Sequence, residues 1–416
     1  MSLSEHWFSD CGGIDNFLRH YWQQKPLLIR QAFPGFQSPV SADELGGLAL
    51  EDEIESRLII EDQKTALWSL QNGPFDENIF QTLPPSHWTL LVQAVDQWLP
   101  EVGELLEHFD FLPRWRLDDI MLSYAEDQGS VGPHFDQYDV FLLQGEGQRR
   151  WRVGQVCDAS TPLLEGSDLK ILQDFEQQDE WLLEPGDMLY VPPGVAHWGV
   201  AEGECITYSV GFRAPTGVEM LNDLATELLA RDDQQTAHVY RDPDFSTMSS
   251  VVERQKNSPG FIDKAFIQST KTLLLKQLED DQLLGEWFAR YMTTRKYPDL
   301  ELGESGIDDG QESLPLTEDS IITRHPASRF AALLDVREFD VQELDTQASD
   351  TQEQGGQATL AVDGELYPCS ADFAKLLANQ PVLSLNDISP FSDQEKSIFA
   401  TLLTMGCLVF GNDEEI

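Results

Sequence analysis

The stretch from about Asp119 to Arg213 constrains the fold of this chain most strongly, because short β-rich runs alternate there with Gly, Pro and Asp. Many short strands separated by such turns are typical of a barrel or jelly roll. The runs that we expect to be strands are Ile120–Tyr124, Tyr138–Leu143, Arg149–Val153, Met188–Val191 and Ile206–Phe212. The sequence therefore predicts a barrel or jelly roll at its centre.

The residues on either side of this region have a different texture. Before it, an amphipathic stretch at Phe17–Trp22 predicts a helix, and Pro26 separates that helix from an apolar strand at Leu27–Ile29. After Pro215, apolar residues recur at helical spacing in three stretches. Their marker residues are Met220, Leu221, Leu224 and Leu228, then Phe266, Leu273, Leu274 and Leu278, then Trp287, Phe288 and Tyr291.

The end of the chain predicts a small α+β unit behind a Gly/Asp/Glu-rich linker. Asp363-Gly364 between two apolar runs is a strong hairpin signal. Ser370 caps an expected helix that reaches about Ala378, and Ser392 to Glu395 forms a capping box that opens a last helix. The acidic stretch at 342–357 is expected to be a solvated loop.

Composition and charge narrow the classes of function. Hydrophobic residues make up 41% of the 416 residues, which is enough for real cores. There are 73 acidic and 27 basic residues, a net charge of −46, and such a surface repels phosphate backbones and disfavours direct nucleic-acid binding. It would attract a basic partner, although a salt-adapted or simply soluble surface is the plainer interpretation of the same charge.

The cysteines and the hydropathy indicate a cytoplasmic protein. The five cysteines are scattered, odd in number and never spaced as C-x-x-C, so we expect reduced thiols. The sequence contains no run of about 18 apolar residues, so it predicts no membrane-spanning segment. The first ten residues have neither the basic head nor the apolar stretch of a signal peptide.

Two separated motifs predict a metal site. In a strand, His134 and Asp136 would point to the same side. A third ligand, His197, follows a turn, a short strand and a second turn, 61 residues after Asp136. Two histidines and one carboxylate on one face of a metal ion leave three positions open for O₂ and a chelating cosubstrate, the arrangement of non-haem iron(II) oxygenases.

Structural roles for the same residues stay open at this point. His197 would also suit a hydrogen-bonded histidine of the barrel, and Asp136 would suit a turn. The remaining histidines lie outside the strand cluster, so we expect them at the surface or in packing: His6, His20, His87, His108, His238 and His325.

The run Arg149-Arg150-Trp151-Arg152 supplies a candidate anchor for a cosubstrate such as 2-oxoglutarate. A distal carboxylate buried without a cation would cost several kcal/mol. By strand alternation Arg149 and Trp151 share one face, while Arg150 and Arg152 share the other. An inward Arg149 would clamp the carboxylate through two parallel hydrogen bonds, and the other two arginines are expected at the surface.

These residues resemble those of the JmjC-type ribosomal oxygenases. More closely, the chain is similar to the bacterial cupin-like enzymes that hydroxylate an arginine of a large-subunit ribosomal protein. The resemblance is dense in the first half of the chain. It rests on residues 21–30, 48–51, 55–58, 132–154, 185–197 and 208–215.

The resemblance implies an iron(II)- and 2-oxoglutarate-dependent dioxygenase that inserts oxygen at the β-carbon of an arginine. It implies that His134, Asp136 and His197 bind iron and that Arg149 binds 2-oxoglutarate. The residues that look like the family's contacts to the substrate arginine are Asp119, Met121, Tyr138 and Ser209. Asp119 is the physically persuasive one, because an arginine that enters a closed site needs a carboxylate; a surface acid at a strand edge and a core tyrosine are the plainer interpretations of Asp119 and Tyr138.

The resemblance also implies an α+β architecture of three domains. A JmjC-like double-stranded β-helix domain with an N-terminal α/β extension would occupy 1–215, and a helical dimerisation domain 216–298. A linker at 299–316 would lead to a winged-helix-like domain at 317–416. The expected partners are a basic ribosomal protein as substrate and a second copy of the chain, with no direct contact to nucleic acid or membrane.

Three other functions fit part of the pattern. A cupin-type metalloenzyme without 2-oxoglutarate would not need Arg149. A JmjC-type demethylase would remove a methyl group from methyl-lysine instead of adding an oxygen atom to its substrate. A non-catalytic acidic binding module would need neither the metal nor the cosubstrate.

Overall fold

The computed structural model describes residues 3–64, 67–167, 169–230, 239–298, 302, 320–334 and 356–411, and its chain forms two compact units. The first unit comprises Met1–Thr216, Lys296–Gly303 and Arg324–Ala327. The second comprises Gly217–Arg295, Glu304–Thr323 and Ser328–Ile416. In the described part of the chain, no helix combines the length and the apolar character that crossing a bilayer requires.

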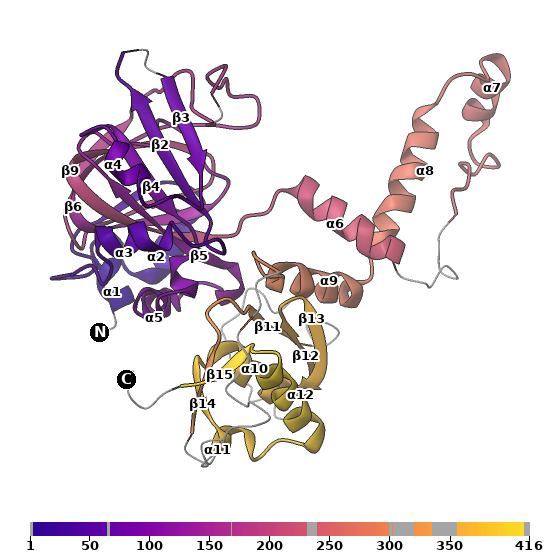
Figure 1. Cartoon of the computed structure of the whole chain (residues 1–416). Coiled ribbons are helices and arrows are strands. Elements are labelled where there is room, and N and C mark those ends of the chain that lie inside the picture. The colour runs from indigo at the N-terminus through magenta and orange to yellow at the C-terminus, as the bar shows by residue number, and fades with distance from the viewer. Residues whose placement is uncertain are drawn as a thin grey trace. The chain divides into compact units, whose positions relative to one another are not determined.

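The first unit is built on a nine-stranded antiparallel sheet (Figure 1). Its strands in spatial order are β1 (Leu27–Ile29), β8 (Met188–Val191), β6 (Asp139–Val156), β9 (Val195–Phe212), β5 (Leu117–Ala125), β4 (Trp88–Val92), β2 (Ser56–Asp62) and β3 (Leu67–Asn72), while β7 (Asp179–Leu183) pairs with the far end of β6. The strands expected at Leu27–Ile29 and Met188–Val191 are confirmed, and the one at Ile120–Tyr124 lies inside β5.

Strands β6 and β9 each run for 18 residues and pair with one another over most of that length. The sequence predicted two separate strands at Tyr138–Leu143 and Arg149–Val153, and that separation is wrong. The glycines between them do not end the strand, because register shifts between Gln144 and Gln148 take up the irregularity and let the strand continue. The strand expected at Ile206–Phe212 is the second half of β9.

Both faces of the central strands are buried, which explains the unbroken apolar run at the start of β6. Phe141 and Leu143 belong to the larger core, which includes side chains of the N-terminal helices. Val140 and Leu142 point the other way, into a second core that contains Trp151. The alternation of side chains along a strand therefore separates a packing face from a face that is free to line a cavity.

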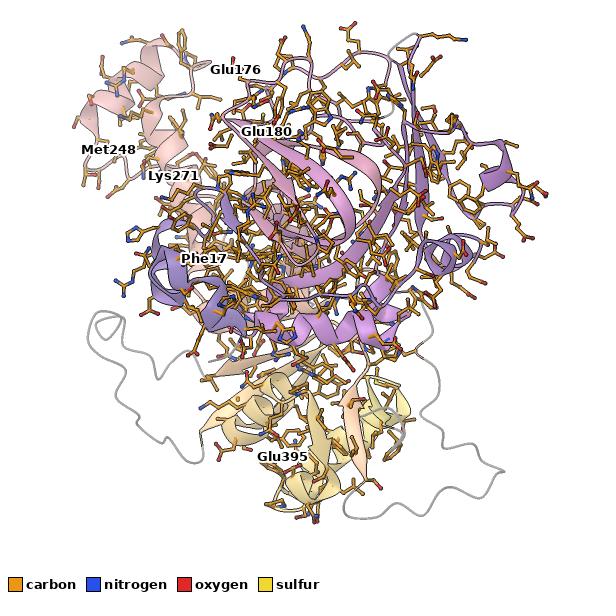
Figure 2. All side chains as sticks on the ribbon, turned by 90° about the vertical axis from the view of Figure 1, so that its left-hand side faces the viewer. Phe17, Glu176, Glu180, Met248, Lys271 and Glu395 are labelled. Carbon is orange, nitrogen blue, oxygen red and sulfur yellow. The ribbon has the colours of Figure 1, made fainter. Side chains whose placement is uncertain are left out.

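Short helices cover the packing face of the sheet (Figure 1). They are α1 (Leu3–Trp7), α2 (Ile14–His20), α3 (Ala42–Leu48) and α5 (Pro100–Gly103), with α4 (Ile79–Thr82) between β3 and β4. The expected helix at Phe17–Trp22 corresponds to α2 and begins three residues earlier. Phe17, labelled in Figure 2, is fully buried on α2 and stacks on Phe8 at a centroid distance of 4.2 Å.

The second unit contains the three helical stretches that the apolar spacing predicted. The helices described between residues 217 and 295 are α6 (Gly217–Ala230), α7 (Ser249–Asn257), α8 (Lys264–Leu275) and α9 (Asp281–Thr293). On α6 only Leu224 of the predicted apolar face is buried, whereas Leu221 is 60% exposed.

Two three-stranded sheets and three helices complete the described part of the second unit. One sheet has the order β14 (Val382–Ser384), β10 (Ile321–Arg324), β15 (Leu408–Phe410), and the other has the order β11 (Phe330–Leu334), β12 (Gln357–Val362), β13 (Glu365–Ser370). The helices are α10 (Ala371–Asn379), α11 (Leu385–Ile388) and α12 (Asp393–Thr404).

The turn and cap signals near the end of the chain are confirmed. Asp363 and Gly364 both have positive φ and join β12 to β13, as a two-residue hairpin requires. The capping box of Ser392 and Glu395 opens α12. Nearly all of the linker at 299–316 and of the acidic loop at 342–357 lies outside the described residues. The three domain boundaries, the dimerisation role of 216–298 and the winged-helix class of 317–416 stay predictions.

Candidate metal centre and its cavity

The structure brings His134, Asp136 and His197 together, although the first two do not lie on a regular strand. His134 forms a single antiparallel bridge with His197, in which each backbone N–H donates to the other residue's carbonyl oxygen, at 3.0 and 2.8 Å. The N–H of Gly194 donates to the Asp136 carbonyl oxygen at 2.7 Å. The expectation of a strand through His134 and Asp136 is therefore wrong, and cross-chain hydrogen bonds position the two side chains instead.

The three side chains have the geometry of a metal-binding group. Their ligand atoms all lie within 4.8 Å of one another. The Asp136 Oδ2 atom is 3.7 Å from His134 Nε2 and 3.5 Å from His197 Nε2. Among the described residues, this is the only such cluster of three metal-ligating side chains.

Backbone carbonyl oxygens fix the orientation of both imidazole rings. The Nδ1 atom of His134 hydrogen-bonds to the Gly132 oxygen at 2.9 Å, and that of His197 to the Val195 oxygen at 3.0 Å. A carbonyl oxygen only accepts, so each Nδ1 carries the proton and each Nε2 presents a lone pair to the centre of the group. This outer-shell arrangement is common for metal-bound histidine.

The electrostatics of the group favour the protonation states that a metal ion needs. Burial, followed by the neighbouring His197, lowers the pKa of His134 to about 4. Burial opposes ionisation of Asp136, but the two histidines outweigh it and hold the pKa of that carboxyl well below its usual range. A neutral imidazole and an ionised carboxylate are the ligand forms, so binding displaces few protons at neutral pH.

Arg149 lies on the inner face of β6, as predicted, and is 2% exposed. Its guanidinium donates to Ser123 Oγ at 2.9 Å and to Thr207 Oγ1 at 3.3 Å, and its Nε has no partner. No carboxylate of the described chain forms an ion pair with it. A buried cation without an anion is costly, so this site fits an anionic ligand.

The two neighbouring arginines point outward, as the strand alternation predicted. Arg150 pairs with Glu180 at 3.0 Å and with Glu202 at 2.6 Å. Arg152 pairs with Glu180 at 2.7 Å. Glu180, labelled in Figure 2, comes from β7.

One cavity of about 520 Å³ connects the metal-binding group to Arg149. All four residues predicted to contact a substrate line it: Asp119, Met121, Tyr138 and Ser209. Asp119 is 3% exposed, so the alternative of a surface acid at a strand edge is wrong. Tyr138 is 46% exposed, so it is not a core tyrosine.

Sequence reasoning missed polar residues that line the cavity or contact Arg149. Ser123 and Thr207 are direct cross-strand partners on β5 and β9, two residues along from the pair formed by Met121 and Ser209. Alternation along two paired strands would have found them once the register was known. Lys296 contacts Asp119 but lies 177 residues away in sequence, and no local sequence pattern predicts this contact.

The remaining histidines of the described chain have other surroundings, as predicted. The ring of His108 packs against Phe33 at a centroid distance of 5.3 Å. His87 hydrogen-bonds to Gln63 and Ser86 near the surface. His238 lies outside the described residues.

Comparison with known proteins agrees with this geometry. A family model described as the JmjC domain matches residues 104–220. The ribosomal protein uL16 3-hydroxylase of Escherichia coli is 36% identical over 282 residues, which cover 68% of this chain and 72% of that protein. The chain belongs to the ribosomal oxygenases.

A second relative and a solved structure are also similar to this ribosomal oxygenase. A probable ribosomal oxygenase of Haemophilus influenzae is 36% identical over 315 residues, which cover 73% of this chain and 74% of that protein. The structure of the Escherichia coli ribosomal oxygenase YcfD in complex with cobalt and 2-oxoglutarate has a TM-score of 0.72 and 28% identity. The alignment covers 96% of this chain and 98% of YcfD, so the likeness is not confined to the cavity.

Proposed function

We propose that this ribosomal oxygenase hydroxylates an arginine side chain of the large-subunit ribosomal protein uL16 at its β-carbon. The reaction consumes O₂ and 2-oxoglutarate. One oxygen atom enters the C–H bond of the substrate, and the other enters succinate as CO₂ leaves. The observation that carries the proposal is the buried Arg149 without an anionic partner, in the same cavity as the His134, Asp136 and His197 group.

The metal-binding group suits iron(II). His134 and His197 would bind through Nε2, since Nδ1 of each ring is engaged with a carbonyl oxygen, and Asp136 would bind through a carboxylate oxygen. When bound, iron(II) supplies the activation of O₂ and the oxidation of the C–H bond. The protein contributes three ligands on one side and leaves the cavity side open.

The floor of the cavity suits the distal carboxylate of 2-oxoglutarate. Arg149 offers a guanidinium, including an Nε–H that lacks a partner, and the hydroxyls of Ser123 and Thr207 lie beside it. A carboxylate bound there would remove the cost of the isolated cation. This support favours 2-oxoglutarate dependence over a cupin enzyme that uses the metal alone.

The opposite end of the cavity suits a cationic side chain. Asp119 supplies a buried carboxylate, while Met121, Tyr138 and Ser209 would hold the aliphatic part of the arginine. The exposed Tyr138 ring offers a stacking surface for a guanidinium. A buried carboxylate also favours hydroxylation of arginine over demethylation of methyl-lysine, because a methylated ammonium group offers fewer hydrogen-bond donors than the planar fork of a guanidinium.

Mass spectrometry of uL16 after incubation with the protein tests the proposed function. With iron(II), 2-oxoglutarate and ¹⁸O₂, we expect one arginine to gain about 18 Da, the mass of one labelled oxygen atom from the open-site chemistry. Arg149→Met should retain the metal and give no gain. A gain that persists without 2-oxoglutarate, or a loss of one methyl group, would contradict the proposal.

We further infer that a second copy of the chain covers the apolar face of the second unit, and that the protein acts in the cytoplasm. A groove of about 940 Å³ there is lined mainly by apolar side chains of α6, α8 and the segment before α8. Phe261, Ile262 and Leu274 are 75%, 78% and 63% exposed. An apolar patch of this kind supports a protein interface.

A ribosomal substrate and five unpaired cysteines support the cytoplasmic location.

A further inference from the structure

Lys296 occupies the end of the cavity at which the proposed function seats the substrate arginine. Its Nζ atom donates to Asp119 Oδ2 at 2.8 Å and to Asp118 Oδ2 at 3.0 Å. The two carboxylates are 4% and 7% exposed, while the Lys296 side chain is 25% exposed. All three residues belong to the first unit and line the same cavity.

We propose that Lys296 is an internal competitor that holds the arginine subsite until a guanidinium displaces it. This inference rests on the proposed function, because it assumes that the incoming ligand is an arginine side chain. It adds that the subsite contains a competing cation from the chain itself.

Charge balance supports an exchange of one cation for another. Asp118 also pairs with Arg213 at 3.1 Å, so the two carboxylates already face two cations. In the described part of the chain, Lys296 is the one cation that pairs with Asp119, whose other partner is the uncharged amide of Gln93. A substrate guanidinium that joined this group without displacing Lys296 would face the ammonium group across the same Asp119 carboxylate, and repulsion between like charges makes that unfavourable.

The chemistry of the two cations explains why the exchange favours arginine. An ammonium group is a compact, strongly hydrated point charge, whereas a planar guanidinium makes two parallel hydrogen bonds to one carboxylate. The Lys296 side chain has four rotatable carbons and partial exposure, so its ammonium can return to water when displaced. A lysine of a substrate gains no such advantage over Lys296, and a neutral side chain cannot replace the charge. Lys296 therefore raises the intrinsic affinity that any side chain needs in order to enter the subsite.

Peptide binding to the metal-loaded protein tests the inference without turnover. The protein is loaded with manganese(II) and 2-oxoglutarate, and calorimetry compares a uL16 peptide with the same peptide carrying lysine in place of the arginine. Lys296→Met should bind both peptides more tightly than the unaltered protein does. If Lys296 occupies the carboxylates nine-tenths of the time, the gain is about tenfold. The gain should be equal for the two peptides, because Lys296 must leave the carboxylates before either peptide binds and therefore lowers both affinities by the same factor.

Two further variants keep the test decisive. Lys296→Arg places a guanidinium in the subsite and should weaken binding of the arginine peptide, and Lys25→Met, on the helical side of the unit, is the matched loss of one lysine. Equal or weaker binding of the arginine peptide by Lys296→Met, with an unchanged melting temperature, would overturn the inference and leave the proposed function standing. If neither protein bound the arginine peptide, the proposed function and the inference would fail together.

Discussion

At the scale of single residues, the buried Arg149 lowers the stability of the fold and at the same time offers a binding site for an anion. Its guanidinium is buried, bonds to two hydroxyls and packs on the Trp151 ring at 5.3 Å, with one N–H left unpartnered. Removing such a group from water is unfavourable unless an anion meets it. At the floor of the cavity the buried cation therefore lowers the stability of the fold, and an anionic ligand would restore it.

Replacing Arg149 with Met should separate these two effects. Without 2-oxoglutarate, we expect the free energy of unfolding to stay the same or rise by about 1–3 kcal/mol, because an uncompensated buried charge disappears. The rise in melting temperature that 2-oxoglutarate gives the unaltered protein should vanish, which thermal denaturation with and without the compound would measure.

Arg152→Met is the matched control, because Arg152 lies on the same strand and pairs with Glu180 at the surface. This variant should keep its response to 2-oxoglutarate. Loss of that response in Arg152→Met, or its survival in Arg149→Met, would contradict the role assigned to Arg149.

The lowered pKa of His134 predicts how the metal-free protein responds to acid. The unfolded chain binds a proton at this side chain as the pH falls through about 6.5, whereas the folded protein binds it only near pH 4. Between these values the unfolded state holds more protons, so the free energy of unfolding falls as the pH falls, by up to about 3 kcal/mol.

Chelator-treated protein provides the measurement. Between pH 7 and pH 5, the free energy of unfolding should fall less steeply in His134→Gln than in the unaltered protein, because Gln does not titrate. Parallel slopes for the two proteins would show that His134 is not held neutral by the fold.

The sequence was enough to predict the candidate metal ligands and the candidate cosubstrate anchor, but not the residues that surround them. Two histidines, Asp136 and Arg149 could be identified because metal coordination and carboxylate binding restrict the residue types. Lys296 could not, because its contact with Asp119 spans 177 residues and depends on the tertiary fold. The prediction of a strand at His134 failed since a single bridge fixes its position there.

At the scale of elements, close packing between β6 and β9 holds the cavity wall. Trp151 on β6 faces Gly199 on β9, and its ring lies 5.9 Å from the ring of His197. A β-carbon added at Gly199 would lie 2.7 Å from the Trp151 ring, closer than any ordinary contact. Glycine is therefore needed at this position so that the ring can lie flat on the neighbouring strand.

Gly199→Ala should destabilise the protein by about 1–3 kcal/mol, because the Trp151 ring must shift in a packed core. The shift should also weaken 2-oxoglutarate binding, since Arg149 packs on that ring. Denaturant unfolding and calorimetry would measure the two effects.

Gly211→Ala on the same strand is the control, because its added β-carbon meets nothing closer than 3.7 Å. It should change the free energy of unfolding much less. Equal destabilisation by the two substitutions would contradict the packing argument.

Element boundaries were predictable where local chemistry sets them and failed where pairing does. The Asp363-Gly364 turn and the capping box at Ser392 are local, and both are present. The predicted break between Leu143 and Arg149 failed, because β6 is held on both sides of its irregular segment by β9. A glycine-rich stretch ends an isolated strand more readily than one that is paired along its length.

At the scale of the whole molecule, the exposed apolar groove predicts association. Leu274→Glu on α8 should place a charge in the groove and convert a two-chain species into a single chain, which sedimentation would detect. Thr272→Glu is the control, since Thr272 lies on α8 outside the groove. A single-chain species for the unaltered protein would contradict the prediction. Lys271, labelled in Figure 2, marks α8.

The net charge of −46 predicts electrostatic steering of a basic substrate. The kcat/KM for intact uL16 should fall as sodium chloride rises, because salt screens the attraction between the two proteins. A short peptide that carries the same arginine between neutral residues should respond much less. Equal salt dependence for the protein and the peptide would indicate that the acidic surface serves another purpose.

Strand β9 carries three residues with different expected roles, and its antiparallel register fixes which way each of them points. His197 near its start would hold the metal, Thr207 stands beside Arg149, and Ser209 lies opposite Met121. Adding or deleting one amino acid between His197 and Thr207 would turn both Thr207 and Ser209 to the other face of the strand, away from the cavity. A library of single-codon insertions across this strand should yield almost no working enzyme, whereas insertions between β3 and β4 should often survive.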